Sequence, residues 1–417
     1  MKPIDAKPLK ICLLSYRSNP HCGGQGVYIK NLSHALKQLG HEVDVVAGPP
    51  APELDANIPL FMLKGLDLYN PSNMYQMPPF KKLWDPVNLM EWLSTSSMGY
   101  PEPFIFGIRA YRYLKNKFHH YDIIHDNQSL SYGLLNMNKH LPTIVTIHHP
   151  ITKDREIAVN SVTATWKKMQ YMRWYSFLHM QKRVARRLKT IITVSECSRK
   201  DIAKDFSIPE DRIRVVPNGI DTTLFRPMPD IKREKNHLIV TNSADSALKG
   251  LYYLLHAIHD LSLKRDIRLT VIGTPKKNGG VEKLIQNLNI QNLITFTGRI
   301  SNDAFIQHYA KSSIAVVPSL YEGFGLPVGE AMACKVPVIC TTGGALPEVA
   351  GNAAVLVPPA DSGALSKAIS YLLDNPEQAE KIGAAGYKRV HHLFSWDMAA
   401  QKTADIYREV IRGNRRF

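Results

Sequence analysis

Short apolar runs rich in β-branched residues recur along the whole chain, and segments with a helical pattern separate them. Continuous apolar runs of this length are typical of strands buried on both faces of a parallel sheet. They predict strands at 9–15, 42–47, 122–126, 143–147, 190–194, 213–216, 238–241, 269–273, 293–296, 314–318, 336–340 and 354–357.

The clearest helical pattern lies between residues 27 and 39. One face of this predicted helix is apolar, and it carries Tyr28, Leu32, Ala35, Leu36 and Leu39. Gly40 follows, in the position where glycine commonly ends a helix. Strands that alternate with such helices predict α/β layers joined by right-handed crossovers.

The alternation runs twice, from about 9 to 216 and from about 238 to 390. Between the two series, 217–236 is rich in proline, asparagine and charged residues and is interpreted as a linker. We therefore expect two α/β domains with a cleft between the carboxyl ends of their strands, where open parallel sheets bind ligands.

One segment, 66–104, interrupts the alternation. It is dense in proline, methionine and aromatic residues and is expected to be a long loop. Long loops in compact domains are usually functional or disordered, and the aromatic content argues against disorder. Two interpretations stay open: a wall of an acceptor pocket, or simple packing or an interface.

The composition is that of a globular protein. The chain has 417 residues, of which 44% are hydrophobic and 21% charged, and these values exclude a disordered or fibrous chain. No apolar run reaches the ~18–20 residues of a membrane span, and the N-terminus lacks the apolar core of a signal peptide. We therefore expect a cytoplasmic protein.

The net charge indicates the kind of partner, and the cysteines indicate which stabilising sites to expect. The formal net charge of +16 favours polyanions: nucleic acid, anionic lipid or phosphorylated small molecules. The five cysteines are scattered and include no C-x-x-C pair, so neither a disulfide framework nor a zinc site is expected.

Two glycine-rich loops carry candidate chemistry. The first, 21–26 (HCGGQG), follows the first predicted strand and precedes a helix, so its backbone N–H groups could approach a phosphate. The second, 322–330 (EGFGLPVGE), follows a strand and opens a helix, with a glutamate at each end. One carboxylate and several N–H groups suit sugar hydroxyls, and the second carboxylate suits the two hydroxyls of a ribose.

The Glu-x7-Glu pattern in this strand–loop–helix setting resembles the retaining glycosyltransferases of family 4, also called glycosyl transferases group 1. Further stretches agree with the family, in its order and over nearly the full chain: 40–43 (GHEV), 194–195 (VS), 216–221 (VPNGID), 296–299 (FTGR), 343–348 (GGALPE) and 394–396 (FSW).

The resemblance implies the GT-B architecture, with two Rossmann-like domains facing across a cleft. The expected organisation is an acceptor-binding domain at 1–220, a nucleotide-sugar-binding domain at 221–395 and a C-terminal helix at 396–417 that crosses back to the first domain. It also implies hexosyl transfer from a nucleotide diphosphate sugar to an acceptor hydroxyl, with retention at the anomeric carbon. UDP and GDP are the expected nucleotides, and the acceptor is a sugar, a lipid-linked sugar or a small molecule.

The resemblance also assigns residues. It implies that Gly23 and Gly24 contact the donor diphosphate, that His148 lies near the donor sugar and that Lys249 neutralises the diphosphate. The stretch 298–300 around Arg299 would contact the base.

The glutamate motif receives the remaining roles. Glu322 and the backbone of Phe324, Gly325 and Leu326 match the sugar-binding loop, and Glu330 matches the ribose ligand. His148, Lys249 and Glu322 form the expected catalytic set, and no side chain is expected to act as a nucleophile.

One departure concerns the diphosphate. The family usually places an arginine five or six residues before the lysine, where this chain has Ser243 or Ala244. Ser243 is therefore the donor-site residue in that slot. Arg17 or Arg299 could supply the missing cation, or N–H groups and Lys249 could hold the diphosphate alone.

No metal and no cofactor are expected. The chain has no Asp-x-Asp pair, which glycosyltransferases of the other common fold use to hold Mg²⁺ or Mn²⁺. The adjacent pairs 119–120 and 148–149 are histidines, but neighbouring histidines rarely chelate one metal together. Cations and helix termini would then stabilise the leaving group.

The segment 167–189 contains eight Lys or Arg residues and no acid, with Trp174, Phe177, Leu178 and Met180 between them. It is either an amphipathic helix on anionic lipid, which would place the protein peripherally at the inner membrane face, or an ordinary helix with a solvated basic face.

Other functions remain as alternatives. A GT-B nucleotide-sugar epimerase or hydrolase would release the nucleotide without an acceptor product. A nucleic-acid binder would need a basic stripe with interleaved aromatics and no donor site, so the Glu-x7-Glu loop argues against nucleic acid as a partner.

Overall fold

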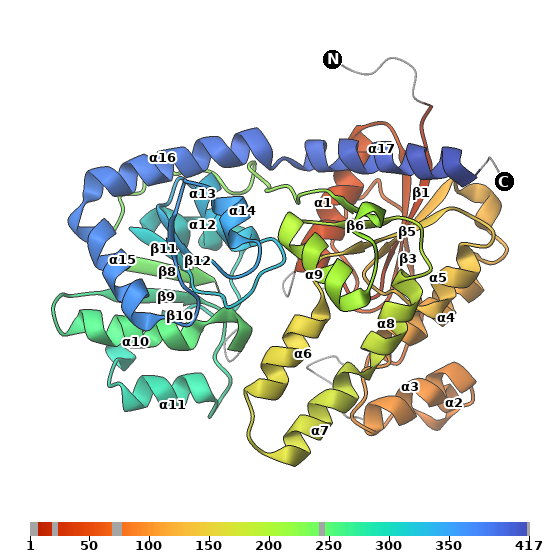
Figure 1. The fold of residues 1–417 in the computed structure, drawn as a ribbon, viewed down its shortest axis with the longest axis horizontal. Helices are drawn as coiled ribbons and strands as arrows, with labels where there is room; N and C mark the ends of the chain where they lie inside the picture. Colours follow the sequence, from red (N-terminus) through yellow and green to blue (C-terminus); the bar gives the residue numbers. More distant parts are fainter. Residues whose placement is uncertain (1–6, 19–23, 69–76, 242–246, 415–417) are drawn as a thin grey trace. The chain divides into compact units, whose positions relative to one another are not determined.

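The computed structural model describes residues 7–18, 24–68, 77–241 and 247–414, and the chain forms two compact units (Figure 1). The first unit comprises Met1–Val194, Arg199–Val216 and Trp396–Phe417, and the second comprises Ser195–Ser198 and Pro217–Ser395. Each unit therefore consists of more than one stretch of chain. A helix able to span a bilayer, which needs about 20 apolar residues, is not found among the described residues.

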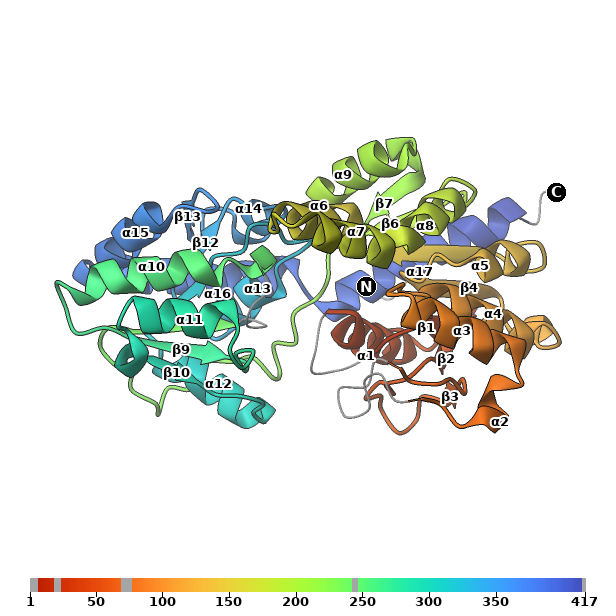
Figure 2. The same ribbon diagram turned by 90° about the horizontal axis from the view of Figure 1, so that it is seen from below.

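The described part of the first unit contains a seven-stranded parallel sheet in the order β3-β2-β1-β4-β5-β6-β7 (Figure 2). Its strands are β1 (Lys10–Ser15), β2 (Glu42–Ala47), β3 (Leu60–Met62), β4 (Ile123–Asn127), β5 (Thr143–Ile147), β6 (Ile191–Thr193) and β7 (Ile213–Val215). Six of these match predicted strands. The short edge strand β3 was missed because its residues are only partly buried or exposed, so it lacks an apolar run.

Helices cover both faces of this sheet. Successive side chains of β1 point to opposite faces, and each face has its own apolar cluster with helical residues. Cys12 and Leu14 join one apolar cluster, whereas Ile11 and Leu13 join the other. The helices of this unit are α1 (Gly24–Gln38), α2 (Phe80–Leu83), α3 (Pro86–Ser96), α4 (Glu102–Leu114), α5 (Tyr132–Met137), α6 (Ile151–Asn160), α7 (Thr165–Trp174), α8 (Leu178–Ala185), α9 (Glu196–Phe206) and α17 (Trp396–Asn414).

Three short 3₁₀ turns, at Phe118–His120, Tyr175–Phe177 and Glu210–Arg212, complete the first unit. The helix predicted at 27–39 is α1, which begins three residues earlier and ends at Gln38. Gly40 has φ +87° and its N–H donates to the Lys37 carbonyl, as expected of a glycine that terminates a helix. Leu39 was placed on the apolar face but lies past the end of the helix and is exposed.

The interpretation of 66–104 as a long loop was wrong for most of its described residues. They form α2, α3 and the first residues of α4. The Asp85 carboxylate caps α3 by accepting the Val87 N–H at 2.8 Å, and Pro86 occupies the first turn. An Asp-Pro start is a recognisable helix signal, which the density of proline and aromatic residues obscured.

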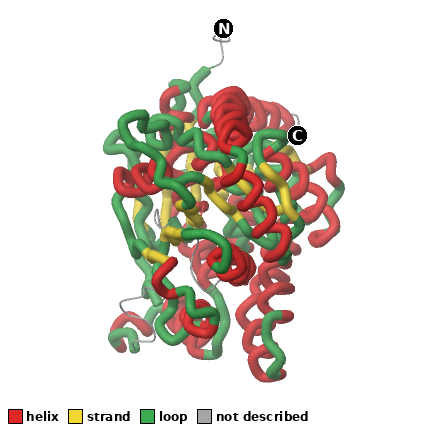
Figure 3. Tube along the Cα trace, turned by 90° about the vertical axis from the view of Figure 1, so that its left-hand side faces the viewer, coloured by secondary structure: helices red, strands yellow, loops and turns green. Residues whose placement is uncertain are grey.

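The described part of the second unit contains a six-stranded parallel sheet in the order β10-β9-β8-β11-β12-β13, and helices surround its strands (Figure 3). Its strands are β8 (His237–Thr241), β9 (Arg268–Ile272), β10 (Ile294–Phe296), β11 (Ile314–Val317), β12 (Val338–Thr341) and β13 (Val355–Val357). All six match predicted strands, because each is a short apolar run in a parallel sheet.

The helices of the second unit are α10 (Leu251–Ser262), α11 (Gly280–Asn287), α12 (Asn302–Lys311), α13 (Leu326–Ala333), α14 (Leu346–Ala350), α15 (Ser362–Asp374) and α16 (Pro376–Leu393). Two 3₁₀ turns lie at Ala247–Lys249 and Gln291–Leu293.

The last described helix, α17, belongs to the first unit, where it packs against α1. Ala400, Ala404 and Tyr407 share an apolar cluster with Tyr28 and Leu32 of α1. Residues 396–414 therefore contribute to the core of a unit whose other segments end at Val216.

Candidate active site

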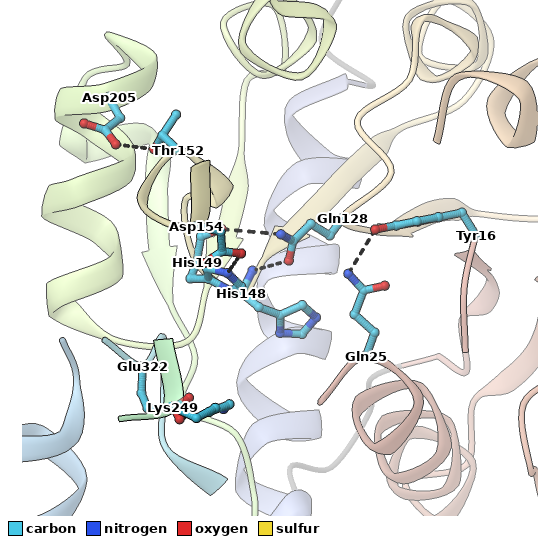
Figure 4. Close-up of polar contacts among 10 residues, drawn as sticks. All are labelled: Tyr16, Gln25, Gln128, His148, His149, Thr152, Asp154, Asp205, Lys249 and Glu322. Atoms are coloured by element: carbon cyan, nitrogen blue, oxygen red, sulfur yellow. Dashed lines mark hydrogen bonds and ion pairs between the residues drawn. The ribbon is translucent and has the colours of Figure 1, made fainter. Parts of the chain in front are cut away.

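The strand order of the second unit defines a switch point between β8 and β11. After β8 the chain continues to β9 toward one edge of the sheet, and after β11 it continues to β12 toward the other edge. The loops that follow these two strands form the crevice in which such sheets bind ligands. The 3₁₀ turn ending at Lys249 follows β8, and the loop containing Glu322 follows β11. The two side chains meet, with Lys249 Nζ 2.7 Å from Glu322 Oε1 (Figure 4).

The carboxylate of Glu322 is held in place from within the same unit. The Ser319 hydroxyl donates to Glu322 Oε1 at 2.8 Å, and the Ala345 N–H donates to the Glu322 carbonyl at 2.8 Å. Gly344 has φ +65°, and a Cβ there would overlap the backbone of Glu322. The GGALPE stretch therefore supports the loop that carries the first glutamate.

The same loop is fixed from another side by residues 195–198. The Gly323 carbonyl accepts the Ser195 hydroxyl at 2.7 Å and the Ser198 hydroxyl at 3.1 Å. The Glu348 carboxylate in turn accepts the Glu196 N–H at 2.8 Å. The stretch Ser195–Ser198 accordingly belongs to the second unit, and it contacts the loop at the Gly323 carbonyl.

The middle of the glutamate motif offers backbone rather than side chains. Phe324 is buried, with its ring edge-on to Phe394 at 5.5 Å. Gly325 has φ +100° at the start of α13, where a Cβ would lie 2.6 Å from Leu346. Only glycine fits this turn, and the turn brings the N-terminal N–H groups of α13 to the loop.

Glu330 lies on α13, close enough to the Lys249–Glu322 pair to interact with both charges. Burial raises the pKa of the Glu330 carboxyl to about 7, the Lys249 ammonium opposes that rise and the Glu322 carboxylate adds to it. The group therefore titrates near neutral pH. The structure therefore brings together Lys249, Glu322 and Glu330, to each of which the family resemblance assigns a role at the donor.

His148 follows β5 at the carboxyl edge of the first sheet. Its Nε2 lies 2.7 Å from Asn127 Oδ1. Its backbone N–H donates to Gln128 Oε1 at 2.9 Å (Figure 4). Burial lowers the pKa of the ring to about 3, so the imidazole is neutral and Nε2 donates to the amide oxygen. A neutral ring orients polar groups but does not replace a cation.

Behind His148 lies a chain of buried hydrogen bonds that sequence reasoning missed. The Tyr28 ring packs edge-on against His148 at 4.7 Å, and its hydroxyl lies 2.9 Å from Thr146 Oγ1. His125 Nε2 is 2.7 Å from the same oxygen, and His125 Nδ1 is 2.6 Å from the Tyr407 hydroxyl. The only sign of this network in the sequence was His125 within a predicted buried strand, and its partner Tyr407 lies 282 residues away.

The neighbouring histidines have separate partners. His149 pairs with Asp154 at 2.9 Å, whereas His148 bonds to Asn127. His119 and His120 lie ring to ring with centroids 4.0 Å apart. Within the described ranges, no group of three or more histidine, cysteine, aspartate or glutamate side chains is arranged to hold a metal ion.

The other residues expected at the donor site belong to the first unit, follow another strand of the second sheet or fall outside the described residues. Gly23 and Ser243 fall outside the described residues, and Gly24 is the exposed first residue of α1. Arg299 is exposed after β10, two strands away from β8. Arg17 belongs to the first unit and pairs with Glu102 at 3.2 Å.

Family models match both units. Residues 22–224 match the model Glycosyltransferase Family 4, and residues 224–389 match Glycosyl transferases group 1. An MMP alpha-(1→4)-mannosyltransferase from Mycolicibacterium hassiacum is 41% identical over 97% of this chain and 98% of that protein.

Solved structures share the fold. Sucrose-phosphate synthase from Thermosynechococcus elongatus superposes with a TM-score of 0.75 at 23% identity, covering 97% of this chain and 100% of that one. HepE from Anabaena, in complex with UDP and glucose, gives 0.70 at 17% identity, covering 96% and 100%. Two Rossmann-like units of this kind are the GT-B architecture of glycosyltransferases. The chain belongs to glycosyltransferase family 4.

Proposed function

We propose that this glycosyltransferase moves a mannosyl group from a nucleoside diphosphate mannose to a sugar hydroxyl, with retention at the anomeric carbon and without a metal ion. The observation that carries the proposal is the Lys249–Glu322 pair, 2.7 Å apart beside Glu330 at the switch point of the second sheet. The mannosyltransferase that is 41% identical supports mannose as the sugar and a 4-hydroxyl as the acceptor group.

Each charged group has a role in this reaction. Lys249 would turn from Glu322 to the diphosphate, whose negative charge grows as the bond between sugar and phosphate breaks. Glu322 and the N–H groups at the start of α13 would then bind sugar hydroxyls, and Glu330 would accept the ribose hydroxyls. The first unit would hold the acceptor, near the neutral imidazole of His148.

In a single displacement, retention requires the acceptor to attack the anomeric carbon on the face that the diphosphate leaves. The bond from the anomeric carbon to the phosphate oxygen breaks, and a bond to the acceptor oxygen forms on the same side. The acceptor proton passes to the leaving phosphate, so no side chain is needed as nucleophile or base. The protein then contributes positioning and charge stabilisation.

The donor is identified by thermal shift with UDP-, GDP- and ADP-sugars, including the mannose and glucose forms. A ligand that binds only the folded protein stabilises it, by about 2.7 kcal/mol at a concentration a hundredfold above its Kd. The melting temperature rises accordingly. We expect one nucleotide diphosphate mannose to stand out, and mannosides with a free 4-hydroxyl to accept the sugar. Nucleotide release without a glycosylated product would instead indicate a hydrolase.

Activity is expected to survive EDTA. Lys249 supplies the positive charge that a metal ion supplies in enzymes with an Asp-x-Asp pair, and this chain has no such pair. Initial rates are compared with and without an excess of EDTA over protein. A rate abolished by EDTA and restored by Mg²⁺ or Mn²⁺ would contradict the metal-free mechanism.

A further inference from the structure

The first unit exposes an unusual set of large apolar side chains on α2, α3, α7 and their flanking residues. We define the apolar surface by its most exposed members: Met77, Phe80, Trp84, Leu93, Met98, Trp166, Met169 and Met172. The exposed fractions reach 85% for Trp84 and 72% for Phe80. Single exposed apolar residues are ordinary, but a group of this size on neighbouring helices marks an interaction site.

The two parts of this surface are joined. Arg173 at the end of α7 donates to the Ser97 hydroxyl just after α3 at 2.9 Å, and the Trp174 ring stacks on Tyr100 at 4.9 Å. Figures 1 and 2 both place α3 and α7 next to each other at one end of the first unit. The exposed side chains of both helices therefore belong to one surface.

The structure divides the basic segment 167–189 into two parts. Phe177, Leu178 and Met180 are buried, so α8 is an ordinary scaffold helix, and these residues do not form a lipid-facing side. In α7, whose residues are all described, none is buried. The exposed apolar residues lie earlier than expected, at Trp166, Met169 and Met172.

Positive charge surrounds this surface. Lys167 and Lys168 are exposed on α7, and the stretch 157–195 contains no acidic residue. Lys81 and Lys82 are exposed on α2. The acids of α2 and α3 are neutralised: Asp85 faces Arg112 at 3.7 Å, and the buried Glu91 pairs with Arg109 at 2.6 Å.

The α7 part of this surface follows His148 in the chain. The strand β5 ends at Ile147, and His148 and then α6 and α7 follow directly. The strand β3 ends at Met62, and α2 and α3 come next. Both helical segments thus come after strands of the same parallel sheet in the chain.

From these observations we infer that the apolar surface docks the first unit on an anionic lipid bilayer. Tryptophan and methionine side chains would enter the headgroup region, while lysines beside them contact lipid phosphates. A second copy fits less well, because two surfaces rich in lysine would face each other. The inference does not depend on the identity of the donor.

Vesicle co-sedimentation tests the inference with the full-length protein. We expect binding to phosphatidylglycerol vesicles at low salt, weaker binding at physiological salt and none to phosphatidylcholine vesicles, because screening acts over about 8–10 Å. Tryptophan emission should shift to the blue on binding, because Trp84 and Trp166 leave water. No binding to phosphatidylglycerol even at low salt overturns the inference.

Two sets of variants separate the contribution of apolar insertion from that of the lysine charges. The triple variant Trp84→Ser, Trp166→Ser, Met169→Ser should lose at least about tenfold in partitioning, since three exposed apolar side chains no longer insert. The pair Lys167→Gln, Lys168→Gln should lose about fivefold for each lysine. Unchanged melting temperatures would show that both variants are folded.

Matched controls lie in the second unit. Leu263→Ser with Tyr371→Ser removes two exposed apolar side chains, and Lys367→Gln with Lys381→Gln removes the same charge as the lysine pair. Both control variants should bind like the unchanged protein. If they lose as much as the first set, binding is non-specific and the inference fails. If light scattering shows a dimer that the triple variant abolishes, without vesicle binding, the surface is instead an interface between copies.

Discussion

Replacing Glu330 with glutamine is expected to stabilise the protein and to weaken donor binding. Burial disfavours the charged form of the Glu330 carboxyl and raises its pKa to about 7. Ionising this group in the folded protein therefore costs free energy of folding. Because the pKa in the unfolded chain is near 4.5, this cost is complete above pH 7 and disappears as the pH falls toward 4.5. It is on the order of 3 kcal/mol, which glutamine would recover in part.

Donor affinity should change in the opposite direction. An ionised carboxylate can accept both ribose hydroxyls, and a charge-assisted hydrogen bond contributes roughly 1.5–3 kcal/mol. Glu330→Ala should therefore lose about ten- to a hundredfold in donor affinity by calorimetric titration, and Glu330→Gln somewhat less. Unchanged affinity in both variants would remove Glu330 from the donor site.

The pH dependence gives a second measurement on the same residue. In the unchanged protein, donor affinity should rise as the pH passes upward through about 7, because Glu330 becomes ionised. The Glu330→Gln variant should lack this step. Glu380→Gln, which replaces an exposed glutamate of α16, is the matched control and should keep both the step and the original melting temperature.

Replacing Lys249 with alanine is expected to reduce turnover by about a hundred- to a thousandfold, as the loss of a group that stabilises developing charge typically does. The effect on donor affinity should be smaller, because the charge on the leaving oxygen is greatest in the transition state. Single-turnover rates measured at saturating donor separate the two effects. Lys264→Ala, at an exposed position after α10, is the control.

This variant also leaves Glu322 without its ammonium partner, on a side chain that is only 13% exposed. A loss of stability could then be mistaken for a loss of catalysis. The double variant Lys249→Ala, Glu322→Gln removes the unpaired charge, so it should recover melting temperature but not rate. If turnover in Lys249→Ala equals that of the unchanged protein, another group carries the role.

The fold was largely predictable because its strands are continuous apolar runs in parallel sheets. The exception, β3, is a three-residue edge strand with no buried residue. Helices were harder to place where aromatic and basic residues mix. Phe177 within 167–189 and Trp166 just before it look alike in the sequence, but Phe177 is buried and Trp166 is exposed. Only the packing of α7 and α8 separates them.

The candidate site was predictable where a motif and the topology agree. Lys249 and Glu322 each follow a central strand of the second sheet, and the strand order brings those strands together. Neither source of information applied to His125 and Tyr407. They are 282 residues apart, each is an ordinary residue in its own element, and only the position of α17 pairs them.

That position has a consequence for synthesis on the ribosome. The first unit needs Tyr407 and its neighbours in α17 to complete the apolar cluster that includes α1 and to pair His125. The helix is translated about 180 residues after Val216, where the unit's other segments end. At the usual elongation rates the nascent unit waits roughly 10 to 40 s with that face of its sheet covered by α1 but not by α17. The second unit, whose main segment is synthesised within this interval, can complete its core first.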